Sequence, residues 1–315
     1  MVMKTIPYLP LELVLNIITC SLPSSLDALL DAAHPTNKLL PTFTLVCHET
    51  RRLANRYLRQ HCVYLSSERR LGSFLRAIPD QPALQSVTSL SLAPFHNHID
   101  DLPLCSWIRE LLCYTCETLR RLIIDIPLRT LYPEDDHLAV RRVLREGFER
   151  LVNLEEFVST QDELYLDVFD GEFAVLWKSW PKLKKLALWN VAADEVFWRH
   201  VSLHPSLQTL ILSSPDCLME VDPEVEYHKH TTRPIRVLIC SAANRYRRRL
   251  DYLPNTDCQY PKEMMQISEY FLPDTHESWA FRLHQEYVKR AAEGGSLWDW
   301  EGEEIRYLAP IDNVS

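Results

Sequence analysis

The sequence contains little glycine. Only six glycines occur among its 315 residues, where an average composition would supply roughly twenty. None of them forms G-x-G-x-x-G, G-x-x-x-x-G-K-[ST] or G-x-S-x-G. The absence of these patterns excludes a standard dinucleotide site, a P-loop and a nucleophile elbow, because each needs glycine where the backbone turns sharply or approaches a phosphate.

The sequence also lacks an excess of basic residues and any long apolar run. Its 34 Lys and Arg face 43 Asp and Glu, which gives a net charge of −9. General nucleic-acid binding is therefore not expected, since such proteins gain affinity by neutralising phosphates. The cluster Arg51, Arg52, Arg56 and Arg59 is expected to be a solvated helix face. No run of 18 apolar residues occurs, so no membrane-spanning helix is expected.

The cysteines and histidines do not form a metal-binding pattern. Nine cysteines at irregular spacing indicate reduced thiols and a cytosolic or nuclear protein. Cys113-x-x-Cys116 lacks the second pair that a structural zinc site needs, and His228-x-His230 stands in a polar stretch. We expect no metal, no cofactor and no catalytic residue, and hence a protein that is not an enzyme.

The N-terminal segment predicts a small unit of three helices. Leu13, Val14, Ile17 and Ile18 share one helical stripe. Prolines interrupt the apolar residues before Leu13, so the sequence predicts a folded helix here rather than a signal peptide. A short second helix is expected near 26–30, a loop at 34–41 and a third helix at 42–60. The stripes are wide for so small a unit, so either the following domain or a separate partner covers them.

The same segment resembles an F-box over roughly residues 5–65. The resemblance consists of Leu9-Pro10-Leu11-Glu12-Leu13, a run of Leu and Ile, and then Leu45-Val46-Cys47 before a basic helix. It implies docking on a Skp-type adaptor and through it on a cullin–RING ubiquitin ligase. The residues expected to bind the adaptor are Leu9, Pro10, Leu13, Ile17, Val46, Cys47 and Leu53.

Two departures from the family pattern keep an alternative open. Thr50 stands where the family often has Trp, and the stretch between Leu22 and Val46 is about ten residues longer than usual. The alternative is a repeat-containing interaction protein whose F-box is vestigial and serves no ligase.

A repeated leucine pattern fills the middle of the chain. Pro181-x-Leu183-x-x-Leu186-x-Leu188 recurs 24 residues later, from Pro205 to Leu212. Weaker copies are centred on Leu90, Leu122, Phe157 and Leu238. Helical stripes separate the copies, and their residues include Ile108, Leu144, Val196 and Val201. L-x-x-L-x-L is the strand pattern of a leucine-rich repeat, and alternating strands and helices predict parallel pairing. The sequence therefore predicts a divergent leucine-rich-repeat-like array, with an ordinary α/β sheet as the alternative.

The residues between the leucines would point to the other face of the strands and bind a target protein. Trp189 is a candidate anchor, because aromatic residues dominate binding hot spots, unless it covers an end of the core. The residues expected to contact the target are Arg121, Asp125, Lys185, Trp189, Thr209 and Ile211.

The last part of the chain changes character. A helix is expected from Thr275 to Glu293, with Ala280, Leu283, Tyr287 and Ala291 on one stripe, and Gly294 and Gly295 would end it. The predicted fold is thus α/β, with an F-box-like unit at 1–65, an irregular solenoid at 66–240 and a C-terminal helical cap with a tail at 241–315. The predicted function is the substrate-recognition subunit of a Skp–cullin–F-box ubiquitin ligase.

Overall fold

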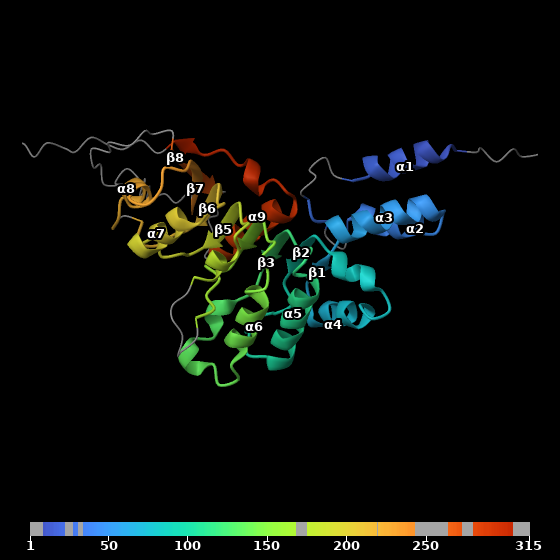
Figure 1. Ribbon diagram of the computed structural model, residues 1–315, viewed down its shortest axis with the longest axis horizontal. Coiled ribbons are helices and arrows are strands. Elements are labelled where there is room, and N and C mark those ends of the chain that lie inside the picture. Colours follow the sequence, from blue (N-terminus) through green and yellow to red (C-terminus); the bar gives the residue numbers. More distant parts are fainter. Residues whose placement is uncertain are drawn as a thin grey trace, which may run out of the picture.

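The computed structural model describes residues 9–22, 28–30, 34–167, 175–218, 220–242, 264–272 and 280–304. They form an α/β protein built around one sheet, beside which three N-terminal helices make a separate unit (Figure 1). The predicted α/β class is confirmed.

Within the described residues, the sheet has nine strands that follow one another in chain order. Strands β1 to β8 pair in parallel, and β9 pairs antiparallel with β8. Parallel neighbours require a crossover between each strand and the next, which matches the predicted alternation of strands and helices. The strands are β1 Tyr64–Leu65, β2 Ser89–Leu92, β3 Arg121–Ile124, β4 Glu156–Ser159, β5 Lys185–Trp189, β6 Thr209–Ser213, β7 Ile235–Ala242, β8 Met265–Leu272 and β9 Glu303–Glu304.

The central apolar residues of the repeated pattern lie side by side across the sheet. In the register of β2 to β6, Leu90 pairs with Leu122, and the series continues through Phe157, Leu186 and Leu210. All five are buried. The last predicted copy is wrong by one residue, because Leu210 pairs with Val237 rather than with Leu238. A shift of one residue turns a strand side chain to the opposite face.

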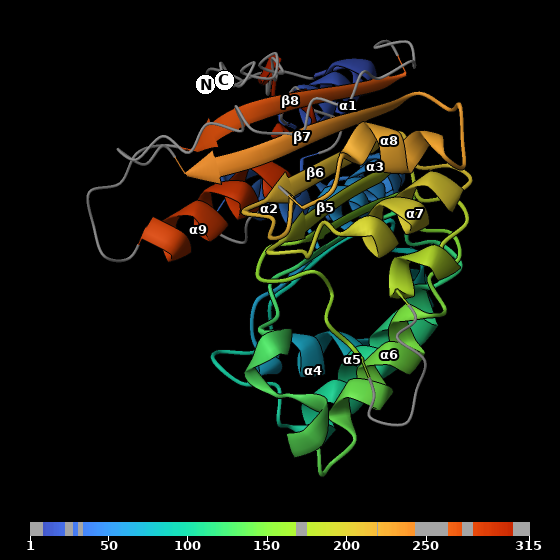
Figure 2. The ribbon, with the colours of Figure 1, turned by 90° about the vertical axis from the view of Figure 1, so that its left-hand side faces the viewer.

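Helices cover the leucine side of the sheet. They form the main hydrophobic core with the strands, and the predicted stripe residues Ile108, Leu144 and Val201 are buried in it. Val196 is an exception and is exposed, although it was placed on a buried stripe. Figure 2 shows this layer on the side of the strands opposite the C-terminal helix. The layer contains α4 Glu68–Ala77, α5 Leu102–Thr115, α6 Val140–Phe148, α7 Glu195–Leu203 and α8 Pro223–His228. Short 3-10 turns lie at Pro82–Ser86, Leu128–Thr130, Pro133–Asp135, Leu176–Ser179 and Leu297–Asp299.

The N-terminal unit has three helices, with different bounds from those predicted. They are α1 Leu11–Cys20, α2 Pro35–Phe43 and α3 His48–His61. The predicted loop at 34–41 is instead most of α2. Pro35 occupies the first helical turn, where its missing N–H costs nothing, and the His34 ring accepts a hydrogen bond from Thr36 N at 3.3 Å. The predicted second helix is not present at 28–30, and its residues 26 and 27 lie outside the described part.

The sheet extends past the boundary placed at residue 240. Strand β7 runs to Ala242, and β8 pairs with it along its whole length. The predicted boundary leaves β8 outside the array, whereas the structure includes it in the sheet; residues 243–263 lie outside the described part. Helix α9 Ala280–Glu293 ends where expected, and Gly295 has a left-handed φ of 75° after it.

We expect truncation of the central leucines to cost stability. Leu186→Ala and Leu210→Ala should each lower the free energy of unfolding by roughly 2–5 kcal/mol, because each leaves a cavity between sheet and helices. Urea denaturation measures this, with the exposed Val196→Ala as a control that should change little. Wild-type stability in both leucine variants would show that these residues do not hold the core together.

Candidate functional site

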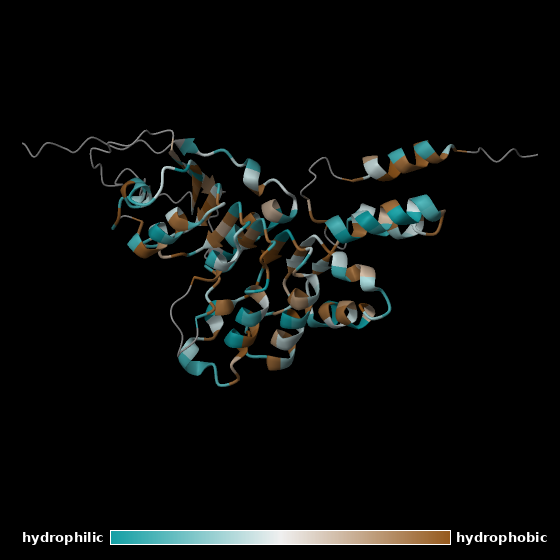
Figure 3. Ribbon diagram, viewed as in Figure 1, coloured by the Kyte–Doolittle hydropathy of each residue, from teal (hydrophilic) through white to brown (hydrophobic). Residues whose placement is uncertain are grey.

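Exposed apolar side chains gather on the N-terminal unit. Fifteen large hydrophobic residues are exposed among the described residues, and seven of them lie between residues 9 and 46. Figure 3 shows hydrophobic stretches, in brown, along α1, which lies apart from the sheet. We call this set the apolar patch: Leu9, Leu11, Leu13, Ile17, Leu39, Leu45 and Val46.

The structure divides the seven residues predicted to bind an adaptor. Leu53 is partly buried and packs against Ile18, Leu40 and Ala54 in the small core of the unit. The other six are exposed: Leu9, Pro10, Leu13, Ile17, Val46 and Cys47. Sequence periodicity missed Leu45, which is 80% exposed in the turn between α2 and α3. Its position directly before Val46 in the F-box-like motif was the signal that could have identified it.

Thr50 stabilises the start of α3, next to the patch. Its hydroxyl oxygen accepts a hydrogen bond from Cys47 N at 3.0 Å, and the side chain is fully buried. This contact satisfies an amide at the helix N-terminus. Hydrogen bonds from the Thr50 side chain and backbone lower the pKa of the exposed Cys47 thiol. The residue that departs from the F-box pattern therefore has a local structural role.

The second predicted surface, on the sheet, is covered by the chain itself. Trp189 and Ile211 point away from the leucine side as expected, but both are completely buried. Helix α9 and the turn after it pack over them through Val288, Ala292 and Leu297. Trp189 is therefore a core residue rather than an exposed anchor. The buried stripe of α9 is also offset by one residue from the predicted one, and Leu283 is exposed.

Polar contacts fix α9 on the sheet. The ammonium of Lys289 lies 2.5 Å from an Asp125 carboxylate oxygen, and Ser91 donates a hydrogen bond to Glu293 at 3.0 Å. Burial lowers the pKa of Lys289, but its attraction to Asp125 outweighs this and leaves the pKa raised. Asp125, predicted to contact a target, is instead a partner of α9. The C-terminal helix thus lies across the sheet rather than at its end.

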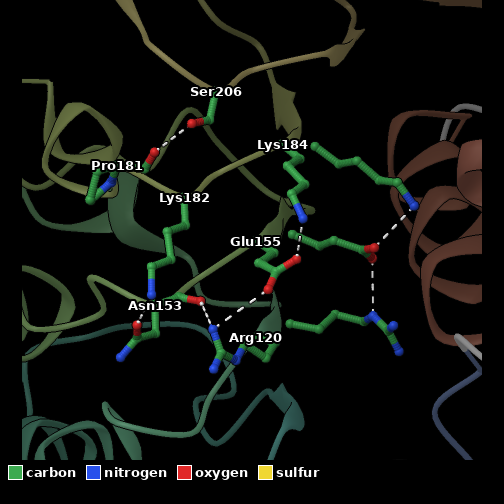
Figure 4. A network of polar contacts seen from close by, with 10 residues as sticks. Arg120, Asn153, Glu155, Pro181, Lys182, Lys184 and Ser206 are labelled. Carbon is green, nitrogen blue, oxygen red and sulfur yellow. Dashed lines mark hydrogen bonds and ion pairs between the residues drawn. The ribbon is translucent and has the colours of Figure 1, made fainter.

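Two rows of charged residues cross the strands where β3, β4 and β5 begin (Figure 4). In one row Glu155 pairs with Arg120 at 3.5 Å and with Lys184 at 2.6 Å. In the other, Glu156 lies 3.0 Å from both Arg121 and Lys185. Arg121 and Lys185 are partly exposed here, as is Thr209 in the neighbouring β6. These three remain the accessible members of the predicted target-binding set.

These rows border a cleft between α3 and the sheet. Its volume is about 450 Å³. Opposite Arg120 and Arg121, the wall is formed by Arg56 and Arg59 of α3. Neither α3 arginine forms an ion pair with a carboxylate within the described ranges. Hydroxyl groups and carboxylates complete the lining: Ser86, Thr88, Ser89, Glu155 and Glu156, together with Gln60.

The titratable side chains considered for metal binding do not cluster. Within the described ranges, no group of three His, Cys, Asp or Glu is placed to hold a metal ion. Cys116 donates to the Cys113 carbonyl at 3.2 Å, as an ordinary helical thiol does. His228 contacts the Thr231 carbonyl at 3.3 Å. No helix in the described part is long and apolar enough to cross a bilayer.

Two buried charged side chains hold the loops around α6 and β4, namely Arg141 in α6 and Asp162 shortly after β4. Arg141 is fully buried, and its guanidinium donates to the backbone carbonyls of Leu128, Leu131, Tyr165 and Asp167. Asp162 accepts hydrogen bonds from backbone amides on both sides, namely Leu128 N at 3.0 Å, Leu164 N at 2.9 Å and Tyr165 N at 3.4 Å. These contacts satisfy loop backbone that would otherwise be buried without partners. Both residues therefore hold the loops in place and offer no exposed catalytic group.

Comparisons with known proteins returned no match. No protein-family model matches the sequence, no curated protein matches it, and no solved structure matches it. The features of the chain that bear on its function are therefore the apolar patch, the charged cleft and the F-box-like motif.

We expect Asp162 to make stability depend on pH. Burial raises its pKa to about 7, whereas an unfolded carboxyl titrates near pH 4. Between these values the folded chain binds more protons than the unfolded chain, so stability falls as pH rises through this window. Between pH 5 and pH 8 the wild type should lose about 2.5 kcal/mol relative to Asp162→Asn, because the window from pH 5 to the pKa spans about two units at about 1.4 kcal/mol each.

Urea denaturation at the two pH values tests this expectation. Asp80→Asn is the matched control, because Asp80 is exposed and its replacement should leave the pH dependence unchanged. A constant difference between wild type and Asp162→Asn at both pH values would contradict the assignment.

Proposed function

We propose that the protein is a substrate receptor of a Skp–cullin–F-box ubiquitin ligase. Helices α1 to α3 dock on a Skp-type adaptor through the apolar patch, and the sheet domain binds a target protein. In this role the chain brings the target close to a ubiquitin-loaded enzyme and makes no bond itself, so its contribution is proximity. The proposed place of action is the cytosol or nucleus, where such ligases operate.

The single observation that supports the proposal best is the apolar patch itself. Leu13 and Ile17 are about half exposed on α1, at 51% and 48%, while Ile18 of the same helix is completely buried. The helix thus has apolar residues on an inner and an outer side, and among the described residues only the inner side packs into the small core of the unit. Contiguous exposed apolar residues mark protein–protein interaction sites. Six of the seven residues that the F-box resemblance assigns to adaptor binding are exposed.

The arrangement of the sheet supports the finer description of the fold that we propose, a divergent leucine-rich-repeat array. Its parallel strands follow one another in chain order, and a helix or short turn accompanies most of them. Such arrays offer extended binding surfaces. Because α9 covers the face that includes Trp189, we place target binding at the edge where the strands begin, which includes Arg121, Lys185 and Thr209.

The competing candidate is an interaction protein with a vestigial F-box. Two observations favour it: Thr50 replaces the usual Trp and is buried as part of the cap of α3, and α2 occupies the stretch that exceeds the usual F-box length. In this case the patch would bind no adaptor, and the sheet domain would act alone.

We expect Leu13→Asp to abolish adaptor binding. Co-expression with a Skp-type adaptor, followed by size-exclusion chromatography, should give a 1:1 complex for the wild type and separate proteins for the variant. Burial of a charge in the interface should weaken binding by several kcal/mol. Val196→Asp is the matched control, because Val196 is 57% exposed on α7 and its replacement adds the same charge elsewhere.

Circular dichroism of both variants checks that they are folded. A folded Leu13→Asp variant that binds the adaptor as the wild type does would refute docking through α1. A wild type that is folded and never binds the adaptor would establish the vestigial alternative.

A further inference from the structure

The cleft between α3 and the sheet concentrates positive charge in an acidic protein. Four arginines line it, two from α3 and two from the start of β3. The chain as a whole has a net charge of −9. The cleft therefore differs in sign from the average surface, and charge on a concave surface attracts ligands of the opposite sign.

The two walls of the cleft differ in how their charges are compensated. On the sheet wall, Arg120 and Arg121 share Glu155 and Glu156 with Lys184 and Lys185, so four cations face two carboxylates. On the α3 wall, Arg56 and Arg59 lack a carboxylate partner within the described ranges. The lining of the cavity therefore carries four arginines against two glutamates, an excess of two positive charges, and Lys184 and Lys185 pair with the same two glutamates from outside the lining.

The donors in the cleft suit carboxylates better than a compact apolar group. Guanidinium groups bind carboxylates through paired, parallel hydrogen bonds, and Ser86, Thr88 and Ser89 add hydroxyl or backbone donors along the floor. The volume of about 450 Å³ falls within the range of ordinary ligand sites. The residues that line the cleft come from α3, β2, β3 and β4 and the residues next to these strands. A cleft that spans several elements and carries several arginines indicates an extended ligand with more than one negative charge.

We propose that this cleft binds an acidic peptide segment, rich in Asp or Glu, of the target protein. Arg56 and Arg59 contact the carboxylates of the peptide, and the row of Arg121, Glu156 and Lys185 fixes its direction along the strand ends. The inference names the target class for the proposed receptor, but the binding itself needs no adaptor. It can therefore fail or succeed separately from docking through α1.

Fluorescence polarisation of the full chain, without adaptor, tests the proposal. The probe is a fluorescein-labelled peptide of alternating Glu and Ser, compared with the same peptide carrying Gln in place of Glu. We expect saturable binding of the Glu peptide, weakening as salt is raised, and no saturable binding of the Gln peptide. Absence of saturable Glu-peptide binding at millimolar concentration would overturn the proposal.

Matched variants distinguish binding in the cleft from nonspecific electrostatic attraction of the peptide to the rest of the surface. Arg56→Gln with Arg59→Gln should raise the Kd at least about tenfold, because two charge-assisted contacts are lost. Arg69→Gln with Arg142→Gln removes the same charge from exposed positions on α4 and α6 and should change the Kd less than about twofold. An equal loss in both double variants would overturn the assignment to the cleft.

Two further arms test the ligand class and the link to docking. A phosphoserine peptide without Glu that binds while the Glu peptide does not would overturn the assignment of a carboxylate-rich ligand. The variant with Arg56→Gln and Arg59→Gln should still form the 1:1 complex with a Skp-type adaptor, which shows that it is folded. Loss of that complex together with unchanged peptide binding would overturn the role of these arginines in the cleft.

Discussion

The register of the parallel strands is the constraint on which the other elements depend. Each central apolar residue, from Leu90 to Val237, lies beside the corresponding residue of the next strand and beneath the helical layer. Because the strands follow one another in chain order, the segment between two strands must cross one face of the sheet and return. The leucine spacing thus sets both the position of the helices and the direction of every intervening side chain, including those that reach α9 and the cleft.

The second face of the sheet shows why a binding surface cannot be read from strand alternation alone. Alternation correctly places Trp189 and Ile211 opposite the leucines, but their burial depends on α9, about 80 to 100 residues further along the chain. The contacts that hold α9 and the turn after it there include the ion pair of Lys289 with Asp125. Beyond the helix, the Trp300 ring stacks on the Tyr270 ring, with the two ring centroids 4.4 Å apart. No local pattern indicates such pairs.

Much of the fold could nevertheless be predicted from local chemistry. Strong periodicity located the strands around Leu186 and Leu210, the helices around Ile108 and Leu144, and α1. The errors arose where tertiary contacts or neighbouring residues outweighed a local signal. Proline and polar residues suggested a loop where Pro35 begins α2. The dense apolar run at 235–242 fits either phase of a strand, and the predicted phase of β7 is wrong by one residue. For the candidate site, the F-box-like motif identified the exposed residues of α1. The cleft could not be predicted, because it forms where α3 lies next to β3, and the spacing of residues along the sequence does not indicate that contact.

The contact between the two ends of the described chain has a consequence for biosynthesis. Leu29 N donates to the Glu293 carbonyl at 2.6 Å, and Leu30 N donates to the His61 carbonyl. A segment next to the N-terminal helices is therefore held by the last turn of α9. During translation, strands β1 to β7 emerge before α9. Trp189, Ile211 and Leu238 therefore remain open to water until more than 50 further residues have left the ribosome. The nascent chain thus displays a broad apolar face for several seconds at ordinary elongation rates of about 5–20 residues per second, a substrate for chaperones that the finished protein no longer presents.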